Sequence, residues 1–190
     1  MAEPATRRPA VFLDRDGTMT EEVGYLNHLS RFRLLPGVEE AVRRLNEASL
    51  PVVVVTNQSG VARGYFPESL VAEVHERMRA DLLKAGARLD GVYYCPHVSA
   101  DRCDCRKPKP GMLEQAAREL GLDLRRSFVV GDRHSDVELA HCVGARSILV
   151  RTGYGEGELA WQAKNWPRQP EFVAADLPFA VNWILQGIQR

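Results

Sequence analysis

Two aspartates separated by one residue follow a short apolar run near the start of the chain. Asp14 and Asp16 come after VFL and before a Gly-Thr pair. In extended backbone, side chains two residues apart point to the same side, so both carboxylates can face one site. Such a pair stays fully ionised only beside a cation, and Mg²⁺ prefers carboxylate, carbonyl and phosphate oxygens. The pair predicts a metal site where one aspartate attacks phosphate and the other transfers a proton; a helix cap plus a turn aspartate is the structural alternative.

Polar residues also follow three later apolar segments. The run PVVVV is followed by hydroxyl, amide and backbone N–H groups that can hold phosphate oxygens, those of Thr56, Asn57, Gln58 and Ser59. Lys107 lies beyond a third segment, and Asp132 ends a fourth, with Asp136 one turn into the next predicted helix. Taken one at a time, these features are equally typical of a polar turn, a solvated lysine or a helix cap.

A second group of residues that can bind metal lies in the segment CPHVSADRCDC at 95–105. It supplies three thiols and one imidazole, from Cys95, His97, Cys103 and Cys105. These form a complete tetrahedral Zn²⁺ set with no open position, which predicts a structural zinc in this loop. The spacing is tighter than in zinc fingers and indicates no nucleic-acid module; free thiols in a turn are the alternative. We expect Cys142, in an apolar helical context, to be a small core residue.

The apolar periodicity predicts strands that alternate with helices. Strands are expected at 10–13, 51–58, 91–95, 127–132 and 146–150, and helices from Pro36-Gly37, at 67–84, 111–120 and 134–143. Residues 17–35 are expected to form a flap-like loop, 153–170 show no clear pattern, and the last segment predicts a short strand and a closing helix capped by Asp176. This alternation predicts one α/β domain over residues 1–190, with a doubly wound, Rossmann-like parallel sheet and no large cap domain. Sites in such sheets form at the carboxyl ends of the strands, where all the polar residues above fall.

Composition excludes some classes of partner. The chain has 190 residues, with 25 Lys and Arg balancing 25 Asp and Glu, so no global field recruits nucleic acid or an anionic membrane. No segment has the apolar length of a signal peptide or a membrane span. We expect a cytoplasmic protein that acts on a small molecule, without nucleic-acid or membrane partners, as a monomer.

The order D-x-D-G-T, then T, then K, then G-D-x-x-x-D resembles the haloacid dehalogenase superfamily of phosphatases over nearly the whole chain. The resemblance implies that Asp14 is the nucleophile, which forms an aspartyl-phosphate, and that Asp16 is the general acid and base. It implies that Mg²⁺ binds the Asp14 and Asp132 carboxylates and the Asp16 carbonyl oxygen. Thr56 and Lys107 would stabilise the transferring phosphoryl group. Asp136 would orient a metal-bound water or Arg133.

Superfamily members with this zinc loop act on a heptose 1,7-bisphosphate or on histidinol phosphate. The segments TNQSGVARGYF, EEVGYLN and LVRTGYG are similar to the heptose group, which removes the 7-phosphate, whereas CDCRKPK fits both. The resemblance implies a substrate pocket lined by Glu22, Tyr25, Asn57, Gln58, Ser59, Arg63, Arg106 and Arg133. The three arginines suit a second phosphate, while an amino-alcohol phosphate would need an acid such as Glu22.

A receiver-like signalling module is a remote alternative, because receivers also combine an aspartate cluster, a Thr or Ser and a Lys on a doubly wound sheet. A receiver, however, needs neither an acid two residues beyond its phosphoacceptor nor a zinc-clamped loop. The chain is also considerably longer than such a module requires.

Overall fold

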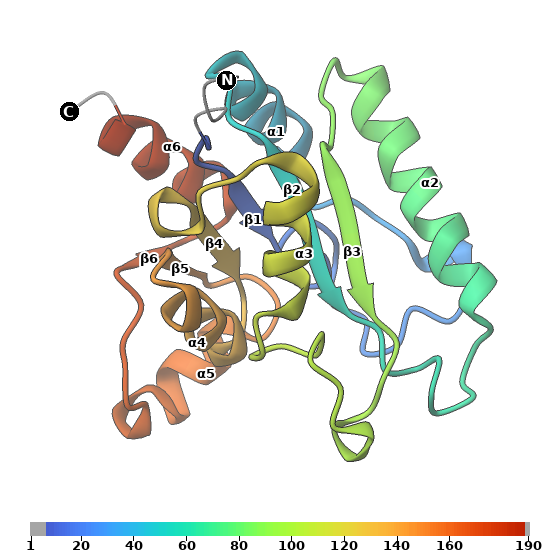
Figure 1. The fold of residues 1–190 in the computed structure, drawn as a ribbon. Helices are drawn as coiled ribbons and strands as arrows, with labels where there is room; N and C mark the ends of the chain where they lie inside the picture. Colours follow the sequence, from blue (N-terminus) through green and yellow to red (C-terminus); the bar gives the residue numbers. More distant parts are fainter. Residues whose placement is uncertain (1–6, 189–190) are drawn as a thin grey trace, which may run out of the picture.

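Six parallel strands form one sheet in the order β3-β2-β1-β4-β5-β6 in the computed structural model, which describes residues 7–188 (Figure 1). The strands are β1 (Val11–Leu13), β2 (Val52–Asn57), β3 (Gly91–Cys95), β4 (Phe128–Gly131), β5 (Arg146–Val150) and β6 (Phe172–Ala174). The helices are α1 (Val38–Glu47), α2 (Glu68–Lys84), α3 (Gly111–Leu120), α4 (His134–Val143), α5 (Gly155–Trp161) and α6 (Leu177–Ile188). The predicted α/β fold with a doubly wound parallel sheet is confirmed.

The first strand lies at the centre of the sheet because its residues are buried on both faces. In β1, Leu13 is in register with Val54 of β2 and Val130 of β4. The N–H of the next residue, Asp14, still donates to the Val130 carbonyl oxygen at 2.9 Å. The strand therefore delivers its aspartates to the edge of the sheet at a fixed height relative to both neighbours.

Helices cover both faces of the sheet. One core layer packs alternate strand residues such as Leu13 and Val54 against apolar residues of α1, α2 and α6. The other packs Phe12, Val53 and their neighbours against α3 and α4. The sequence pattern already indicated this arrangement, because β-branched runs without polar interruption suit strands covered on both sides.

Two segments differ in detail from their predicted form. The flap-like loop over 17–35 contains a short 3-10 turn at Leu29–Arg31 and isolated bridges that join Thr20 to Asp16 and to Leu34. The stretch 153–170, which showed no clear pattern, contains α5. Asp176 caps α6 as predicted, because its Oδ1 accepts the Phe179 N–H at 3.0 Å.

The prediction for Cys142 was wrong. Its side chain is exposed, whereas Val137, Leu139 and Ala140 of the same helix are buried. Cys142 is the second-to-last residue of α4 and lies beyond the last buried position of that helix, Ala140. Within residues 7–188, no helix is both long and apolar enough to cross a membrane.

Candidate active site

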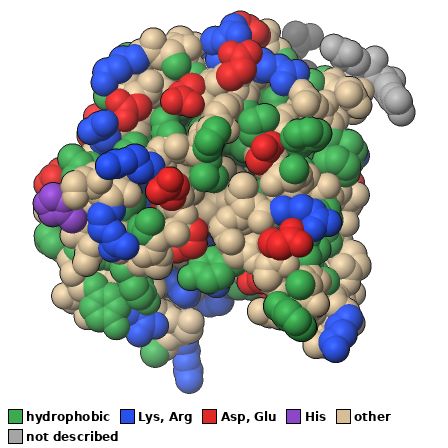
Figure 2. Space-filling model, turned by 180° about the vertical axis from the view of Figure 1, so that it is seen from behind, with side chains coloured by type: hydrophobic (Ala, Val, Ile, Leu, Met, Phe, Trp, Pro, Cys, Tyr) green, Lys and Arg blue, Asp and Glu red, His purple; other side chains and the backbone are tan. Residues whose placement is uncertain are grey.

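The carboxyl ends of β1, β2 and β4 meet at one edge of the sheet and form the floor of a cavity of about 480 Å³. Seen from behind, this lower edge of the molecule is notched (Figure 2). The cavity brings together the predicted catalytic and substrate-contact residues: Asp14, Asp16, Thr56 and Lys107, with Glu22, Tyr25, Asn57, Gln58, Ser59, Arg63, Arg106 and Arg133. It is also lined by residues that the sequence did not single out: Gly24, Leu26, Gly60, Ser99, Ser135 and Tyr154.

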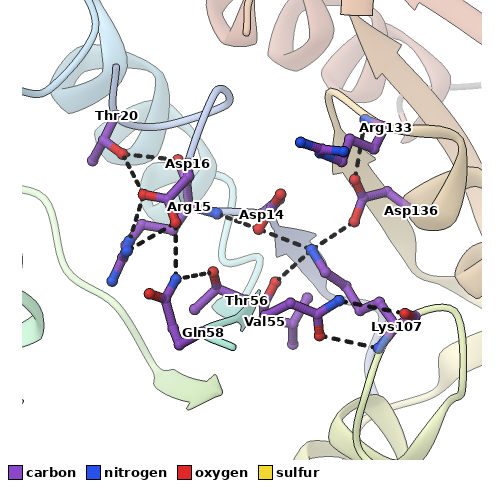
Figure 3. A network of polar contacts seen from close by, with 11 residues as sticks. Asp14, Arg15, Asp16, Thr20, Val55, Thr56, Gln58, Lys107, Arg133 and Asp136 are labelled. Atoms are coloured by element: carbon purple, nitrogen blue, oxygen red, sulfur yellow. Dashed lines mark hydrogen bonds and ion pairs between the residues drawn. The ribbon is translucent and has the colours of Figure 1, made fainter. Parts of the chain in front are cut away.

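A buried lysine connects the end of β1, the strand β2 and the helix α4 (Figure 3). The Lys107 ammonium lies 2.8 Å from Asp14 Oδ1 and 2.7 Å from Asp136 Oδ1, and donates to the Val55 carbonyl oxygen at 3.1 Å. Burial lowers the pKa of Lys107, but the two carboxylates outweigh burial and raise the pKa above its ordinary value. Lys107 is therefore a permanent cation beside Asp14, where phosphoryl charge would develop.

Asp132 has one carboxylate oxygen in use and one without a partner. Its Oδ2 accepts the Tyr154 N–H at 2.7 Å, whereas the buried Oδ1 has no hydrogen-bond partner among the described residues. Burial, reinforced by the charge of Asp14, raises the pKa of Asp132 to about 8. Burial likewise raises the pKa of Asp14 to about 7, although Lys107 opposes the shift. Asp14 shares its one cation, Lys107, with Asp136, and Asp132 has no ion pair among the described residues, so one lysine leaves the three acids with excess negative charge.

The acids at this site fit a divalent cation. Carboxylate oxygens of Asp14, Asp132 and Asp136 all lie within 4.8 Å of one another. The oxygens of Asp136 are occupied by the Lys107 ammonium and the Arg133 N–H, so Asp136 orients its neighbours and is a poor candidate ligand. Asp14 and Asp132 retain free acceptor capacity, and oxygen ligands from two carboxylates suit Mg²⁺.

Asp16 occupies a separate hydrogen-bond network that the sequence did not predict (Figure 3). Its carboxylate accepts two bonds from the Arg15 guanidinium, at 3.0 Å from Nε and 2.8 Å from a terminal nitrogen. Arg15 is 1% exposed, and its other terminal nitrogen lies 3.3 Å from His75 Nε2. Because a guanidinium only donates, His75 must accept through Nε2 in its neutral form. Burial, followed by the charge of Arg15, lowers the pKa of His75 to about 3.

The polar residues at the end of β2 line the cavity and also form hydrogen bonds with other residues of the site. Gln58 Nε2 donates to Asp16 Oδ2 at 2.8 Å and to the Thr56 hydroxyl at 2.9 Å. Asn57 exchanges two bonds with the backbone of Lys107, at 3.1 and 3.3 Å. These contacts fix the position of Lys107 relative to β2, a role that was not predicted for Asn57.

The four predicted zinc ligands converge. Their ligand atoms lie within 4.8 Å of one another, and Cys95 Sγ is 3.6 Å from both Cys103 Sγ and His97 Nδ1. Two sulfurs bound to one tetrahedral Zn²⁺ would lie about 3.8 Å apart, so the cluster fits that ion. The cluster also positions a cavity residue, because Arg106 donates to the His97 carbonyl oxygen at 3.0 Å.

Aromatic and charged side chains form the rim of the cavity. Tyr25 and Tyr65 contact edge to face, with ring centroids 4.8 Å apart, and so join two loops. Glu22 is half-buried, and burial raises its pKa even though its Oε1 accepts the Gly24 N–H at 2.5 Å. The exposed Arg63 and Arg133 add positive charge at the mouth.

The doubly wound sheet and the acid-lysine site at its carboxyl edge define the class, a hydrolase with an α/β fold and a site that suits phosphate. The chain belongs to the haloacid dehalogenase-like hydrolases. Residues 17–141 match that family, and residues 104–180 match the HAD-hydrolase-like family. The family to which the sequence motifs pointed is thereby confirmed.

Named relatives span nearly the whole chain. The D-glycero-D-manno-heptose-1,7-bisphosphate 7-phosphatase of Thermosynechococcus vestitus is 45% identical over 93% of this chain and 95% of its own length. The D-glycero-beta-D-manno-heptose-1,7-bisphosphate 7-phosphatase of Escherichia coli K12 is 42% identical over 91% and 93%. Among solved structures, the D,D-heptose 1,7-bisphosphate phosphatase of B. bronchiseptica, complexed with magnesium and phosphate, matches with a TM-score of 0.87 and 35% identity over 94% of this chain and 99% of that one.

Proposed function

We propose that this chain is a Mg²⁺-dependent phosphomonoesterase that removes the 7-phosphate of D-glycero-D-manno-heptose 1,7-bisphosphate. The observation that carries the proposal is the acid cluster at the cavity floor: Asp14 lies 2.8 Å from the Lys107 ammonium and within 4.8 Å of Asp132, which has an unpartnered oxygen. The similarity to heptose bisphosphate phosphatases over most of both chains supports the same substrate.

The residues divide the reaction between them. The Asp14 carboxylate, oriented by Lys107 and by its bond from the Arg15 N–H, attacks the phosphorus atom and forms an aspartyl-phosphate. Asp16 enters this step in its acid form and gives its proton to the sugar oxygen as the P–O bond breaks. The resulting carboxylate then takes a proton from the water that attacks the aspartyl-phosphate, which releases phosphate and restores Asp14. Bound Mg²⁺ would keep the Asp14 and Asp132 carboxylates ionised and offset phosphate charge. Asp14, Asp132 and the Asp16 carbonyl oxygen would hold it.

The rim supports a bisphosphate substrate. Arg63, Arg106 and Arg133 line the same cavity and supply cations for a second phosphate group. The alternative substrate, histidinol phosphate, would place an ammonium group near an acid. Glu22 is the acid available there, but one of its oxygens already accepts the Gly24 N–H. The charge balance at the rim therefore favours the heptose bisphosphate over histidinol phosphate.

The substrate is tested by comparing kcat/KM for heptose 1,7-bisphosphate, histidinol phosphate and hexose monophosphates on the purified protein. We expect the heptose bisphosphate to be preferred by at least about a hundredfold, which corresponds to about 3 kcal/mol of transition-state binding. A higher kcat/KM for histidinol phosphate would show that histidinol phosphate, and not the heptose bisphosphate, is the substrate. A stable phospho-aspartate without release of free phosphate would favour the receiver-like alternative.

The proposal has a structural part. Residues 1–190 form one phosphatase domain, with the flap-like loop at 17–35 and a structural Zn²⁺ held by the loop at 95–105. The geometry of the cysteine and histidine cluster supports the zinc assignment. The monomeric state and the cytoplasmic location stay predictions from the sequence.

A further inference from the structure

A short turn between β5 and α5 contacts both the metal-site acid and the cavity rim. The turn comprises Thr152, Gly153 and Tyr154, and we call it the 152–154 turn. It lies far from the D-x-D pair in sequence, and none of the catalytic roles described above uses it. Two sets of contacts, one from its backbone and one from a side chain, indicate what it does.

The backbone of the turn packs directly on Asp132. Thr152 Oγ1 donates to the Gly17 carbonyl oxygen at 2.6 Å, which ties the turn to the loop after β1. Gly153 has a φ of +58°, and a Cβ there would lie 2.1 Å from Asp132 Oδ2 and 2.6 Å from Gly17 Cα. Any other residue would collide with the carboxylate or the opposing backbone, so glycine is required for this approach.

The close approach lets the turn hold one oxygen of Asp132. The Tyr154 N–H donates to Asp132 Oδ2 at 2.7 Å. With Oδ2 bound, the carboxylate cannot rotate freely, and the unpartnered Oδ1 is the oxygen left for a metal ion. Groups that orient a metal ligand in this way contribute strongly to metal affinity.

The side chain of the turn makes a separate contact with the rim. The Arg133 guanidinium carbon lies 3.7 Å from the centre of the Tyr154 ring, and both residues line the cavity. Among residues 7–188, Arg133 forms no ion pair with a carboxylate. The ring face attracts the cation and limits its motion, so the charge stays near the cavity mouth without being neutralised.

We propose that the 152–154 turn is a positioning element with two separable roles. Its backbone sets the Asp132 carboxylate for Mg²⁺, and the Tyr154 ring holds Arg133 for the second phosphate of the substrate. The second role rests on the proposed function, whereas the first concerns metal binding alone. Neither Thr152 nor Tyr154 is a catalytic residue, because each acts through another group.

The ring is tested by Tyr154→Ala with Tyr154→Phe as the conservative variant. Alanine keeps the backbone N–H, so the Kd for Mg²⁺ should change by less than about twofold, while KM for the heptose bisphosphate rises about tenfold. The KM for para-nitrophenyl phosphate should not rise, because this substrate has no second phosphate. Phenylalanine should restore KM toward the wild-type value. A KM in Tyr154→Phe as high as in Tyr154→Ala would overturn the role of the ring.

The backbone is tested by Gly153→Ala, with Mg²⁺ binding measured by calorimetry and by the Mg²⁺-dependent thermal shift. The added methyl should weaken Mg²⁺ binding by at least about tenfold. Thr152→Val, which loses the bond to Gly17 but keeps the side-chain shape, should weaken it in the same direction and serves if the first variant does not fold. Gly157→Ala is the matched control, because nothing lies within 4 Å of a Cβ at that position. Wild-type Mg²⁺ affinity in both test variants would overturn the metal role.

The two proposals fail in different ways. If the wild-type protein does not hydrolyse heptose bisphosphate, the proposed substrate is wrong, but calorimetry on Gly153→Ala and Thr152→Val still decides the metal role. If the wild-type protein hydrolyses it and Tyr154→Ala leaves KM unchanged, the ring has no positioning role and the proposed function stands.

Discussion

Each aspartate of the D-x-D pair contacts a buried cation. Asp14 pairs with Lys107, and Asp16 pairs with Arg15. A buried charge is stable only when it is paired, and these two ion pairs give both buried cations, Lys107 and Arg15, an acidic partner. The four acids of the site exceed its two buried cations by two negative charges, the charge of one Mg²⁺; the acids are Asp14, Asp16, Asp132 and Asp136, and the cations are Arg15 and Lys107.

Replacing the proposed nucleophile should separate effects on chemistry from effects on folding. Asp14→Asn should lower kcat by at least about a thousandfold, because an amide of similar size cannot attack phosphorus. The fold should survive, since Lys107 keeps its ion pair with Asp136. Circular dichroism and steady-state kinetics measure the two effects. Asp176→Asn is a matched control, because asparagine also caps a helix. Near wild-type turnover by Asp14→Asn would refute the nucleophile assignment.

Arg15 depends on a neutral His75, which gives a pH dependence of known sign. The pKa of His75 is lowered to about 3 in the folded protein, so its contribution to stability is complete above pH 6.5 and lost as the pH falls toward 3. Glutamine does not titrate, so His75→Gln should remove this contribution. Between pH 6.5 and 4, the unfolding free energy of the variant should fall less than that of the wild type. Urea titrations at several pH values measure it.

A second prediction at His75, which does not depend on pH, compares the stabilities of two variants. His75→Leu leaves the Arg15 guanidinium without an acceptor and should cost about 1–3 kcal/mol at pH 7.5, whereas glutamine can still accept that bond. Equal stabilities for the Leu and Gln variants would contradict the importance of the Arg15–His75 bond.

At the scale of elements, the zinc loop connects a metal cluster to the cavity. The loop runs from Cys95 at the end of β3 to Arg106, which the His97 carbonyl oxygen holds. The loop is too long and too polar to be ordered by an apolar core of its own. A tetrahedral ion would therefore order it and, through His97, position Arg106 at the cavity.

Loss of one thiol should show this connection. Cys103→Ser should lower bound zinc well below one per chain and raise KM for the bisphosphate about three- to tenfold, with a smaller change in kcat, because Arg106 loses its support. Metal content by mass spectrometry and steady-state kinetics measure both effects. Cys142→Ser, on an exposed position of α4, is the control. Full zinc content in Cys103→Ser would show that the cluster is not the zinc site.

At the scale of the molecule, the parallel sheet gathers like charges at one edge. The pKa values of Asp14 and Asp132 are raised to about 7 and about 8 from 3.8, chiefly by burial. The folded protein without metal therefore binds more protons than the unfolded chain between pH 4 and 8, and these two acids make its stability fall as the pH rises.

Added Mg²⁺ should reverse this trend. The ion binds the ionised acids of the folded protein, so millimolar Mg²⁺ should raise the Tm, and the increase should be larger at pH 8 than at pH 6. Differential scanning calorimetry in EDTA and in Mg²⁺ measures it, and Asp132→Asn should lose most of the effect. An increase that is independent of pH would place the Mg²⁺ elsewhere.

Much of the fold and the site could be predicted because the signals are local. Unbroken apolar runs marked most strands and period-3.6 patterns marked most helices, and parallel order implied that Asp14, Thr56 and Asp132 meet at one edge. The side chains to which we assign phosphate or metal chemistry were recognisable by type and spacing, and the structure brings them together. The helix α5 was not recognisable from the sequence, because its seven residues include too few apolar side chains to mark a helix face.

The sequence by itself determined which chemical groups are present and on which strand ends they lie. Only the tertiary structure decided their partners: His75 beneath Arg15, 60 residues away, and the 152–154 turn against Asp132. Local patterns encode whether a side chain is buried, but a buried polar group is satisfied by whichever group the chain crossovers bring next to it. Those pairings depend on the packing of the whole sheet and its helices.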